Sequence, residues 1–358
     1  MNRTRLLFYT LFPITCFYVF VYPVARLFHW LNPQANFGLL EMLVLWGVSI
    51  LALWYSFSGP KIVIRYIVVH WMGISSVFAT LTLVTEGLRL VVPTSDLVLG
   101  YGVMITATLA VIGAIAFSHH LSVKKHKISS EKLERSYRIA QISDVHIGSR
   151  QEGFMGRIVS KLNALEPDFV VITGDLIDSS AVGYQALSSL RELEAKTYFC
   201  IGNHERYADL EKILDIAKRL GLTTLRQNCV RENELMFLGV DDADRPDQLK
   251  INLPLMDLDS ASYQVLLYHR PRGWRDARAH GIDLMLSGHT HNGQIFPFNL
   301  LVKQQFKRIR GMFVEGESRL YVSSGTGTWG PLMRLGSMNE ISVFDLIPKR
   351  KTTQGSST

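Results

Sequence analysis

The stretch YRIAQISDVH, residues 137–146, passes from an apolar run to two chemically active side chains, Asp144 and His146. The run over residues 138–143 predicts a β-strand, with Ile139, Ala140 and Ile142 as its apolar residues. Open α/β sheets bind their ligands beyond the carboxyl ends of their strands. The segment therefore predicts a strand whose end carries chemistry.

The same arrangement, a predicted strand followed by polar side chains, recurs at four other places. The strands are predicted at residues 169–173, 197–201, 263–268 and 282–286. The polar groups that follow them are Asp175 with Asp178, Asn203 with His204, His269, and His289 with His291. Gly174, Gly202 and Gly288 precede three of these groups and allow tight turns and close backbone approach.

These side chains offer carboxylate, amide and imidazole donors but no thiolate. The set suits Mn, Fe, Zn or Ni and does not suit a cysteine-based structural zinc site. Residues i and i+2 of an extended strand end point the same way, so Asp144 with His146, and His289 with His291, are each expected to reach one site. These two pairs, the carboxylate of Asp175, the amide of Asn203 and the imidazole of His269 make seven donors. Seven are too many for one tetrahedral ion. If Asp175 bridges, two metal ions can each have four protein ligands, with positions left for a hydroxide and for substrate oxygens.

The rest of the C-terminal part alternates strands with helices. Further strands are predicted at residues 235–240, 320–323 and 341–344, and helices at 156–165, 185–193 and 210–220, the last with Asp209 as its N-cap. This alternation predicts one α/β domain over residues 137–358. The charged segment 124–136 is interpreted as a linker.

Residues 1–123 differ in composition from the remainder of the 358-residue chain. They hold nine charged residues, whereas the remaining 235 positions hold sixty. Four apolar runs, at residues 6–25, 37–57, 66–85 and 97–118, are each long enough to cross a bilayer. A cleaved signal peptide for the first run and buried core helices are the competing interpretations. The composition excludes a fully soluble protein, and three cysteines exclude a disulfide scaffold.

The positive charges between the predicted spans indicate an orientation. Arg3 and Arg5 precede the first span, Lys61 and Arg65 lie between the second and third, and three lysines follow the fourth. Only Arg26 and Arg89 fall on the other side. The positive-inside rule therefore predicts that both termini and the C-terminal domain lie in the cytoplasm. Glu86 and Arg89, three positions apart, are expected to form a local ion pair.

The five groups together resemble the five motifs of the calcineurin-like metallophosphoesterases, and the N-terminal spans resemble the transmembrane bacterial branch of that superfamily. The resemblance covers roughly residues 137–346. It implies a four-layer α/β/β/α sandwich with two mixed sheets, preceded by a four-helix transmembrane segment in the inner (cytoplasmic) membrane. It also implies that Asp144, His146 and His291 bind one metal, that Asn203, His269 and His289 bind the other, and that Asp175 bridges them.

The chemistry expected of such a site is attack by a metal-bound hydroxide on a phosphoester or pyrophosphate. His204, next to Asn203, is the candidate general acid, with a structural histidine as the alternative. Asp178 is expected either to orient a ligand histidine or to cap a helix. Arg206 and Arg270 flank metal ligands and are candidates for binding a phosphate oxygen, or else ordinary ion-pair partners.

The four spans favour a substrate that lies in the membrane. Residues 296–313 interleave apolar and basic side chains, a pattern suited to an anionic leaflet, although an ordinary core element with a basic face would also produce it. Membrane-anchored relatives include hydrolases of lipid-linked substrates such as UDP-2,3-diacylglucosamine. The hypothesis is therefore hydrolysis of a phosphorylated lipid or glycolipid. The alternatives are a tethered phosphodiesterase for soluble nucleotide-type substrates and a membrane sensor or scaffold. No nucleic-acid-binding motif is present, so a nucleic-acid partner is not expected.

Overall fold

The structure is a computed structural model that describes residues 3–35, 37–58, 62–150 and 153–349. Lys61 and the chain end from residue 350 to 358 lie outside the described residues. The chain divides into two compact units. One holds the chain up to Phe117 together with Ile295–Pro297 and Gly330–Leu335, and the other holds Ser118–Gln294, Phe298–Trp329 and the chain from Gly336 onward.

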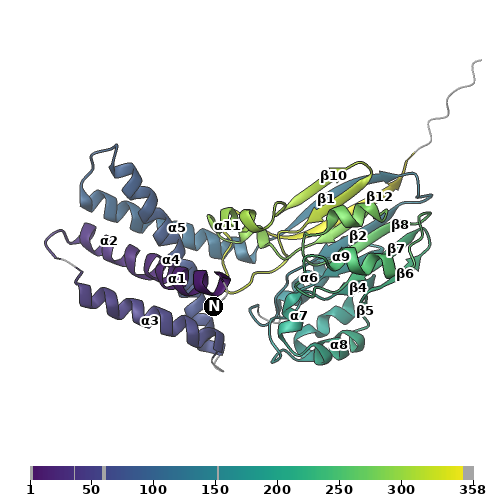
Figure 1. Ribbon diagram of the computed structural model, residues 1–358, viewed down its shortest axis with the longest axis horizontal. Helices are drawn as coiled ribbons and strands as arrows, with labels where there is room; N and C mark the ends of the chain where they lie inside the picture. The colour runs from purple at the N-terminus through teal and green to yellow at the C-terminus, as the bar shows by residue number, and fades with distance from the viewer. Residues whose placement is uncertain (1–2, 36, 59–61, 151–152, 350–358) are drawn as a thin grey trace, which may run out of the picture. The chain divides into compact units, whose positions relative to one another are not determined.

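The first unit is helical. Its elements are α1 (Arg3–Cys16), the π-helical turn η1 (Phe17–Val21), α2 (Tyr22–Leu31), α3 (Leu39–Ser58), α4 (Ile62–Arg89) and α5 (Asp96–His119) (Figure 1). Four helical stretches in the described residues are long and apolar enough to cross a membrane: Thr10–Leu31, Leu39–Ser56, Val63–Arg89 and Asp96–His119. The prediction of four spans is confirmed on length and composition.

The first helical stretch extends beyond the end predicted for it at residue 25, as far as Leu31. The apolar helix continues past Arg26, whose guanidinium pairs with Glu86 of α4. Pairing reduces the cost of a charged group inside an apolar segment. The predicted local pair of Glu86 with Arg89 is wrong, since Arg89 pairs with Asp96 at 2.8 Å.

Two short segments from the C-terminal half pack inside this helical unit. Ile295 and Met333 belong to an apolar cluster with Val77 of α4 and Ala107 and Ala114 of α5. The Leu332 N–H donates to Nε2 of His70 at 3.0 Å, and His70 Nδ1 lies 2.7 Å from the Tyr66 carbonyl oxygen. Because a carbonyl only accepts, Nδ1 carries the proton and the ring is neutral. His70 thereby anchors the segment Gly330–Leu335 to α4.

The second unit contains two mixed six-stranded sheets. The first sheet has the order β1 (Leu121–Ser130), β12 (Asn339–Pro348), β2 (Tyr137–Ile142), β3 (Phe169–Thr173), β4 (Lys196–Cys200) and β5 (Thr223–Thr224). The second has the order β10 (Gly311–Glu315), β11 (Ser318–Val322), β9 (Leu284–Ser287), β8 (Tyr263–Tyr268), β7 (Leu235–Val240) and β6 (Asn228–Glu232). Strands β2, β3 and β4 are parallel to one another, as are β7, β8 and β9.

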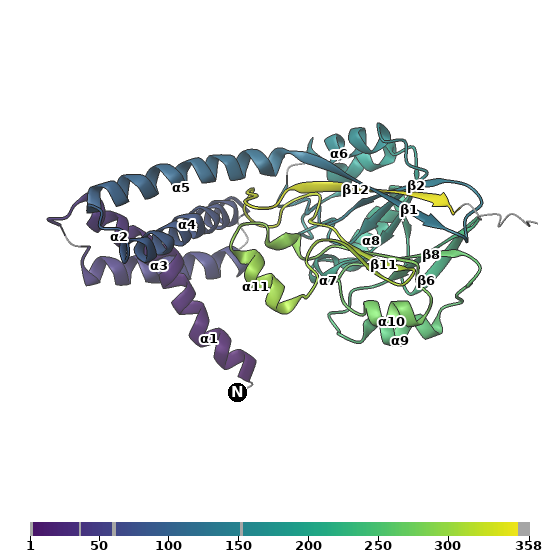
Figure 2. The same cartoon turned by 90° about the horizontal axis from the view of Figure 1, so that it is seen from above.

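The two sheets pack face to face, and helices cover their outer faces. Side chains such as Tyr198, Phe237 and Phe344 fill the space between the sheets. The first sheet is covered by α6 (Gly153–Asn163), α8 (Leu210–Arg219) and the 3₁₀ helix η2 (Tyr184–Glu192). The second is covered by α9 (Gln248–Asn252), η3 (Leu253–Leu255) and α10 (Trp274–Ala279). Figure 2 shows α6 beside β2 and β12, and α9 and α10 on the opposite side of the unit. The predicted four-layer α/β/β/α sandwich is confirmed.

Each buried aromatic or large aliphatic side chain of these layers contributes roughly 1.5–3 kcal/mol of burial free energy. Strand runs such as residues 235–240 are apolar throughout because both faces of the strand are covered. That is why the sequence located these inner strands well. Asp209 is the N-cap of α8, as predicted, with its carboxylate accepting the Lys212 N–H at 3.2 Å.

The segment predicted as a charged linker, 124–136, is largely a strand. Residues Leu121–Ser130 form β1, which pairs in parallel with β12 along its whole length. Leu121 and Ile128 are buried, whereas Lys124 and Lys125 are exposed. Lysines on an edge strand discourage pairing with other chains, and their charge hid the strand pattern. The helix predicted at 185–193 is 3₁₀, and β5, β6 and β10 were not anticipated.

Candidate metal centre

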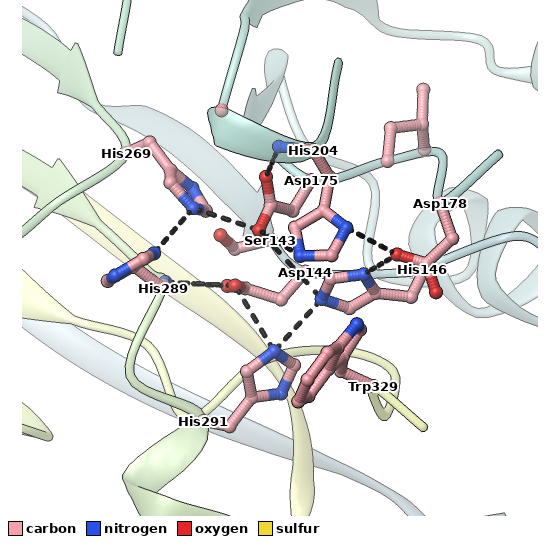
Figure 3. A network of polar contacts seen from close by, with 12 residues as sticks. Ser143, Asp144, His146, Asp175, Asp178, His204, His269, His289, His291 and Trp329 are labelled. Carbon is pink, nitrogen blue, oxygen red and sulfur yellow. Dashed lines mark hydrogen bonds and ion pairs between the residues drawn. The ribbon is translucent and has the colours of Figure 1, made fainter. Parts of the chain in front are cut away.

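The polar groups that follow β2, β3, β4, β8 and β9 converge at one edge of the two sheets (Figure 3). Three groups in the described residues have one potential ligand atom per residue, all within 4.8 Å of one another, and one of them is His146 with Asp178 and His204. The other two contain only predicted ligands. One consists of Asp144, His146 and His291, and the other of Asp175, His269 and His289. The family resemblance implies the same grouping, with Asp175 as the bridge and with Asn203 as a further ligand of the second metal.

The distances within each cluster indicate that the ligand atoms face a common point. His146 Nε2 lies 2.9 Å from His291 Nε2, which is 3.4 Å from Asp144 Oδ1. In the second cluster, His269 Nε2 lies 3.1 Å from Asp175 Oδ2 and 3.2 Å from His289 Nδ1. Asp175 Oδ2 is also 3.9 Å from His146 Nε2. Asp175 therefore lies between the clusters, as a bridging ligand must.

Asn203 supplies an independent test of whether these residues fit metal ions. It begins α7 (Asn203–Tyr207) and is 6% exposed, and its Oδ1 atom is buried with no hydrogen-bond partner among the described residues. A buried acceptor without a partner costs about 1–3 kcal/mol. Metal coordination would satisfy that oxygen, so the donor set fits the two divalent ions that the sequence predicts.

The prediction that each ligand pair lies on an extended strand end is wrong. Asp144 and His146 have φ values of 53° and 56°, and His289 and His291 have 71° and 48°. These are left-handed conformations and not extended strand ends, and each costs of order 1–3 kcal/mol for a residue other than glycine. The pairs meet because tight turns aim both side chains inward. The turn after β2 is held by the Asp144 N–H on the Gly174 carbonyl at 3.0 Å and the His146 N–H on the Asp175 carbonyl at 3.1 Å.

The predicted role of the glycines is confirmed at two close approaches. A Cβ on Gly288 would lie 2.0 Å from Ser143 Oγ and 2.1 Å from Asp144 Oδ2. A Cβ on Gly202 would lie 2.2 Å from Asp175 Oδ1. Any side chain at these positions would displace a ligand carboxylate.

Comparison with known proteins agrees with this geometry. Residues 137–293 match the calcineurin-like phosphoesterase family. An uncharacterized metallophosphoesterase of Aquifex aeolicus is 33% identical over 252 residues, which cover 64% of this chain and 95% of that protein. The chain belongs to the metallophosphoesterases. This family binds a dimetal centre and hydrolyses phosphoesters.

Two other relatives are longer. An uncharacterized metallophosphoesterase of Helicobacter pylori strain J99 is 37% identical over 239 residues, covering 64% of this chain and 65% of that protein. A transmembrane protein with a metallophosphoesterase domain from Danio rerio is 33% identical over 264 residues, covering 67% of this chain and 60% of that protein. The chain thus spans slightly less than two thirds of the length of these two relatives.

In this metallophosphoesterase, Asp178 links a predicted ligand to the predicted general acid. Its Oδ1 atom pairs with Nδ1 of His146 and lies 2.9 Å from Nδ1 of His204, and its Oδ2 accepts a hydrogen bond from Ser149 Oγ. The position matches the predicted orienting role and not a helix cap. Fixing Nδ1 of His146 leaves Nε2 toward the cluster. The Thr173 carbonyl does the same for His269 by accepting from Nδ1 at 2.8 Å.

The candidate phosphate-binding arginines are both paired with aspartates. Arg206 lies 3.1 Å from Asp241 Oδ2, and Arg270 lies 2.6 Å from Asp242 and also pairs with Asp244. The alternative that the sequence left open, an ion-pair role, is the one that these contacts favour. A substrate-binding role for either arginine stays a prediction.

Glu205 is a structural residue of the site that the sequence analysis missed. Its buried carboxylate accepts the N–H groups of Gly202 at 2.8 Å and Asp175 at 2.9 Å, and those of Leu176 and Ile177 at 2.7 and 3.2 Å. These bonds join the loops that follow β3 and β4. The available signal was its place three positions after Gly202, where a glutamate can reach back to accept the N–H of the residue that precedes a helix.

Burial and ion pairing act in opposite directions on the titrations of the site. Burial lowers the pKa of His146, but Asp178 and then Asp175 outweigh it and raise the pKa to about 9. Burial likewise lowers the pKa of His269, and Asp175 and Asp144 raise it to about 10. Burial also opposes ionisation of Asp178, yet His146 and His204 hold the pKa of that carboxyl well below its usual range.

Metal binding is expected to release protons and to tighten as the pH rises. Near pH 7 the medium is below the pKa of both His146 and His269, so both rings are protonated without metal, whereas a metal binds only the neutral ring. Affinity at each site should rise about tenfold per pH unit until the pH approaches these pKa values. Calorimetry with Mn²⁺ or Zn²⁺ in buffers of different ionisation enthalpy measures the released protons. Binding without proton release would contradict the pairing described, and exposed His120→Ala is the matched control.

Proposed function

We propose that the chain is a membrane-anchored phosphohydrolase with two metal ions that cleaves a phosphoester or pyrophosphate in a lipid or glycolipid, for example a UDP-2,3-diacylglucosamine-like substrate. The observation that carries the proposal is the pair of buried Asp/His clusters with Asp175 between them. Two divalent ions, when bound, activate a water molecule and neutralise charge on the phosphoryl oxygens. The proposed metals are Mn, Fe, Zn or Ni.

The chain's own residues would hold the ions and supply a proton. Asp144, His146 and His291 would hold one ion and Asn203, His269 and His289 the other, with Asp175 shared between them. His204 has a side chain that is 17% exposed, with Nδ1 fixed by Asp178 and Nε2 4.0 Å from Asp175 Oδ2. A histidine held at one nitrogen beside the ligands can deliver a proton from the other to a leaving alkoxide.

A lipid substrate is supported by the four candidate spans and by one exposed apolar helix, α11 (Phe298–Gln305). Phe298, Leu300 and Leu301 are 39%, 54% and 60% exposed, and no residue of the helix is buried. Together with the exposed Lys303, they form a surface suited to an anionic leaflet.

The rest of the segment 296–313 is an ordinary packed element. Phe306 is 4% exposed and its ring lies 5.2 Å from that of His289, and Arg308 pairs with Glu315 at 2.9 Å. Membrane contact is therefore proposed for α11 and not for the whole segment. We further propose that the phosphoesterase domain and both termini lie in the cytoplasm, because Lys and Arg are more frequent in the predicted cytoplasmic loops than outside.

Asp175→Asn is expected to lower hydrolysis of bis(p-nitrophenyl) phosphate by the detergent-purified, metal-loaded protein roughly 10³-fold. The substitution removes the bridging charge, and such charge stabilisation is worth several kcal/mol. The metal content of each variant is measured by mass spectrometry. The exposed Asp215→Asn should keep full activity. Protein that holds two metals yet hydrolyses no phosphoester would favour the scaffold alternative.

His204→Ala is expected to lower kcat roughly 10²–10⁴-fold for an alkyl phosphodiester and much less for a p-nitrophenyl ester. A nitrophenolate leaves without a proton, whereas an alkoxide needs one. Steady-state kinetics with both substrates at equal metal content measure the difference, with His120→Ala as control. An equal loss on both substrates would contradict the general-acid role.

A lipid substrate is expected to accumulate when activity is lost. Cells with wild-type protein and cells with Asp175→Asn are compared by mass spectrometry of phosphate-bearing lipids, and the purified proteins are incubated with a membrane lipid extract. Absence of any difference would favour the soluble-substrate alternative.

A reporter fused after Thr358 is expected to lie in the cytoplasm, and a signal from the opposite side would reverse the proposed orientation.

A further inference from the structure

Trp329 is a large apolar side chain that remains exposed beside the polar cluster (Figure 3). It is 38% exposed, and its ring centroid lies 6.0 Å from that of His204 with the planes at 70°. An aromatic side chain buries about 150–250 Å² when it is packed, so leaving one exposed forgoes a large stabilisation. Core packing therefore does not account for its position.

The backbone of Trp329 is held by one side chain. Gln294 Oε1 accepts the Trp329 N–H at 3.0 Å, and Gln294 Nε2 donates to the Trp329 carbonyl, also at 3.0 Å. Gln294 follows the predicted ligand His291 by three residues and has a positive φ of 56°. The amide thus ties Trp329 to the loop that carries two predicted metal ligands.

The chain just before Trp329 is fixed as well. The N–H groups of Thr326 and Gly327 donate to the carbonyls of Ser143 and Asp144 at 2.7 and 3.0 Å. An exposed indole on a backbone held by Gln294 and by these two carbonyls is preorganised for a ligand.

We propose that the Trp329 indole binds the leaving group of the substrate and selects an apolar group next to the scissile P–O bond, with Gln294 as the positioning residue. The inference rests on the proposed phosphoester hydrolysis and on His204 as the proton donor to the leaving alkoxide. Since the indole lies beside His204, the group that receives the proton is the group that contacts the ring. Either an acyl-bearing or an aromatic leaving group would pack against the apolar face of the indole.

The test compares two phosphodiesters that share a methyl ester and differ in the second alcohol, benzyl alcohol or ethanol. These alcohols have similar acidity, so a difference in kcat/KM for their release reports binding and not leaving-group reactivity. Trp329→Ala in the full-length, metal-loaded protein is expected to lower kcat/KM for the benzyl ester roughly tenfold, mainly through KM, because aromatic stacking is of that size. The ethyl ester should change less than twofold, and Trp329→Phe should retain most of the benzyl preference.

Gln294→Ala is expected to reduce the same benzyl preference, whereas the exposed Gln185→Ala should not. Metal content is measured for every variant. Equal losses on both esters after Trp329→Ala, or no loss on either, would overturn the assignment of Trp329. A benzyl preference that stays intact in Gln294→Ala at equal metal content would overturn its positioning role. If wild-type protein with two metals hydrolyses neither ester nor bis(p-nitrophenyl) phosphate, the proposed function itself fails, which is a different outcome.

Discussion

Four carboxylates, Asp144, Asp175, Asp178 and Glu205, lie buried within one small region, and the rest of the site is arranged around their charge. Buried carboxylates are costly unless positive groups or hydrogen-bond donors surround them. Asp175 and Asp178 are surrounded by imidazoles, and Glu205 accepts four backbone N–H groups. The left-handed turns at the ligands and the glycines at the close approaches allow those donors to reach the carboxylates.

The donor arrangement also explains how the two sheets cooperate. Asp144, Asp175 and Asn203 follow strands of the first sheet, whereas His269, His289 and His291 follow strands of the second. Each proposed metal position therefore takes ligands from both sheets. Apolar packing between the sheets sets their separation, so core packing and metal binding depend on each other.

The helical unit is more than four apolar helices, because it also holds Ile295–Pro297 and Gly330–Leu335. These segments directly follow Gln294 and Trp329 in the chain. His70, an ionisable residue in a candidate span, uses both ring nitrogens in hydrogen bonds, one to the Tyr66 carbonyl and one from the Leu332 N–H. Gln294 and Trp329 are thus continuous in the chain with segments that pack among the apolar helices.

The sequence by itself determined the four apolar spans, the inner strands and the seven candidate ligands, because continuous apolar runs and polar groups at their ends are local patterns. It did not reveal β1, whose exposed lysines obscure two buried positions, or the ion pair of Arg26 with Glu86, which joins residues 60 positions apart. It also misjudged how Asp144 and His146 meet, since φ values at a turn depend on the loop packed against it. Only the tertiary structure assigned Glu205, Asp178 and Trp329 their surroundings, because each is defined by groups that the chain brings together from distant segments.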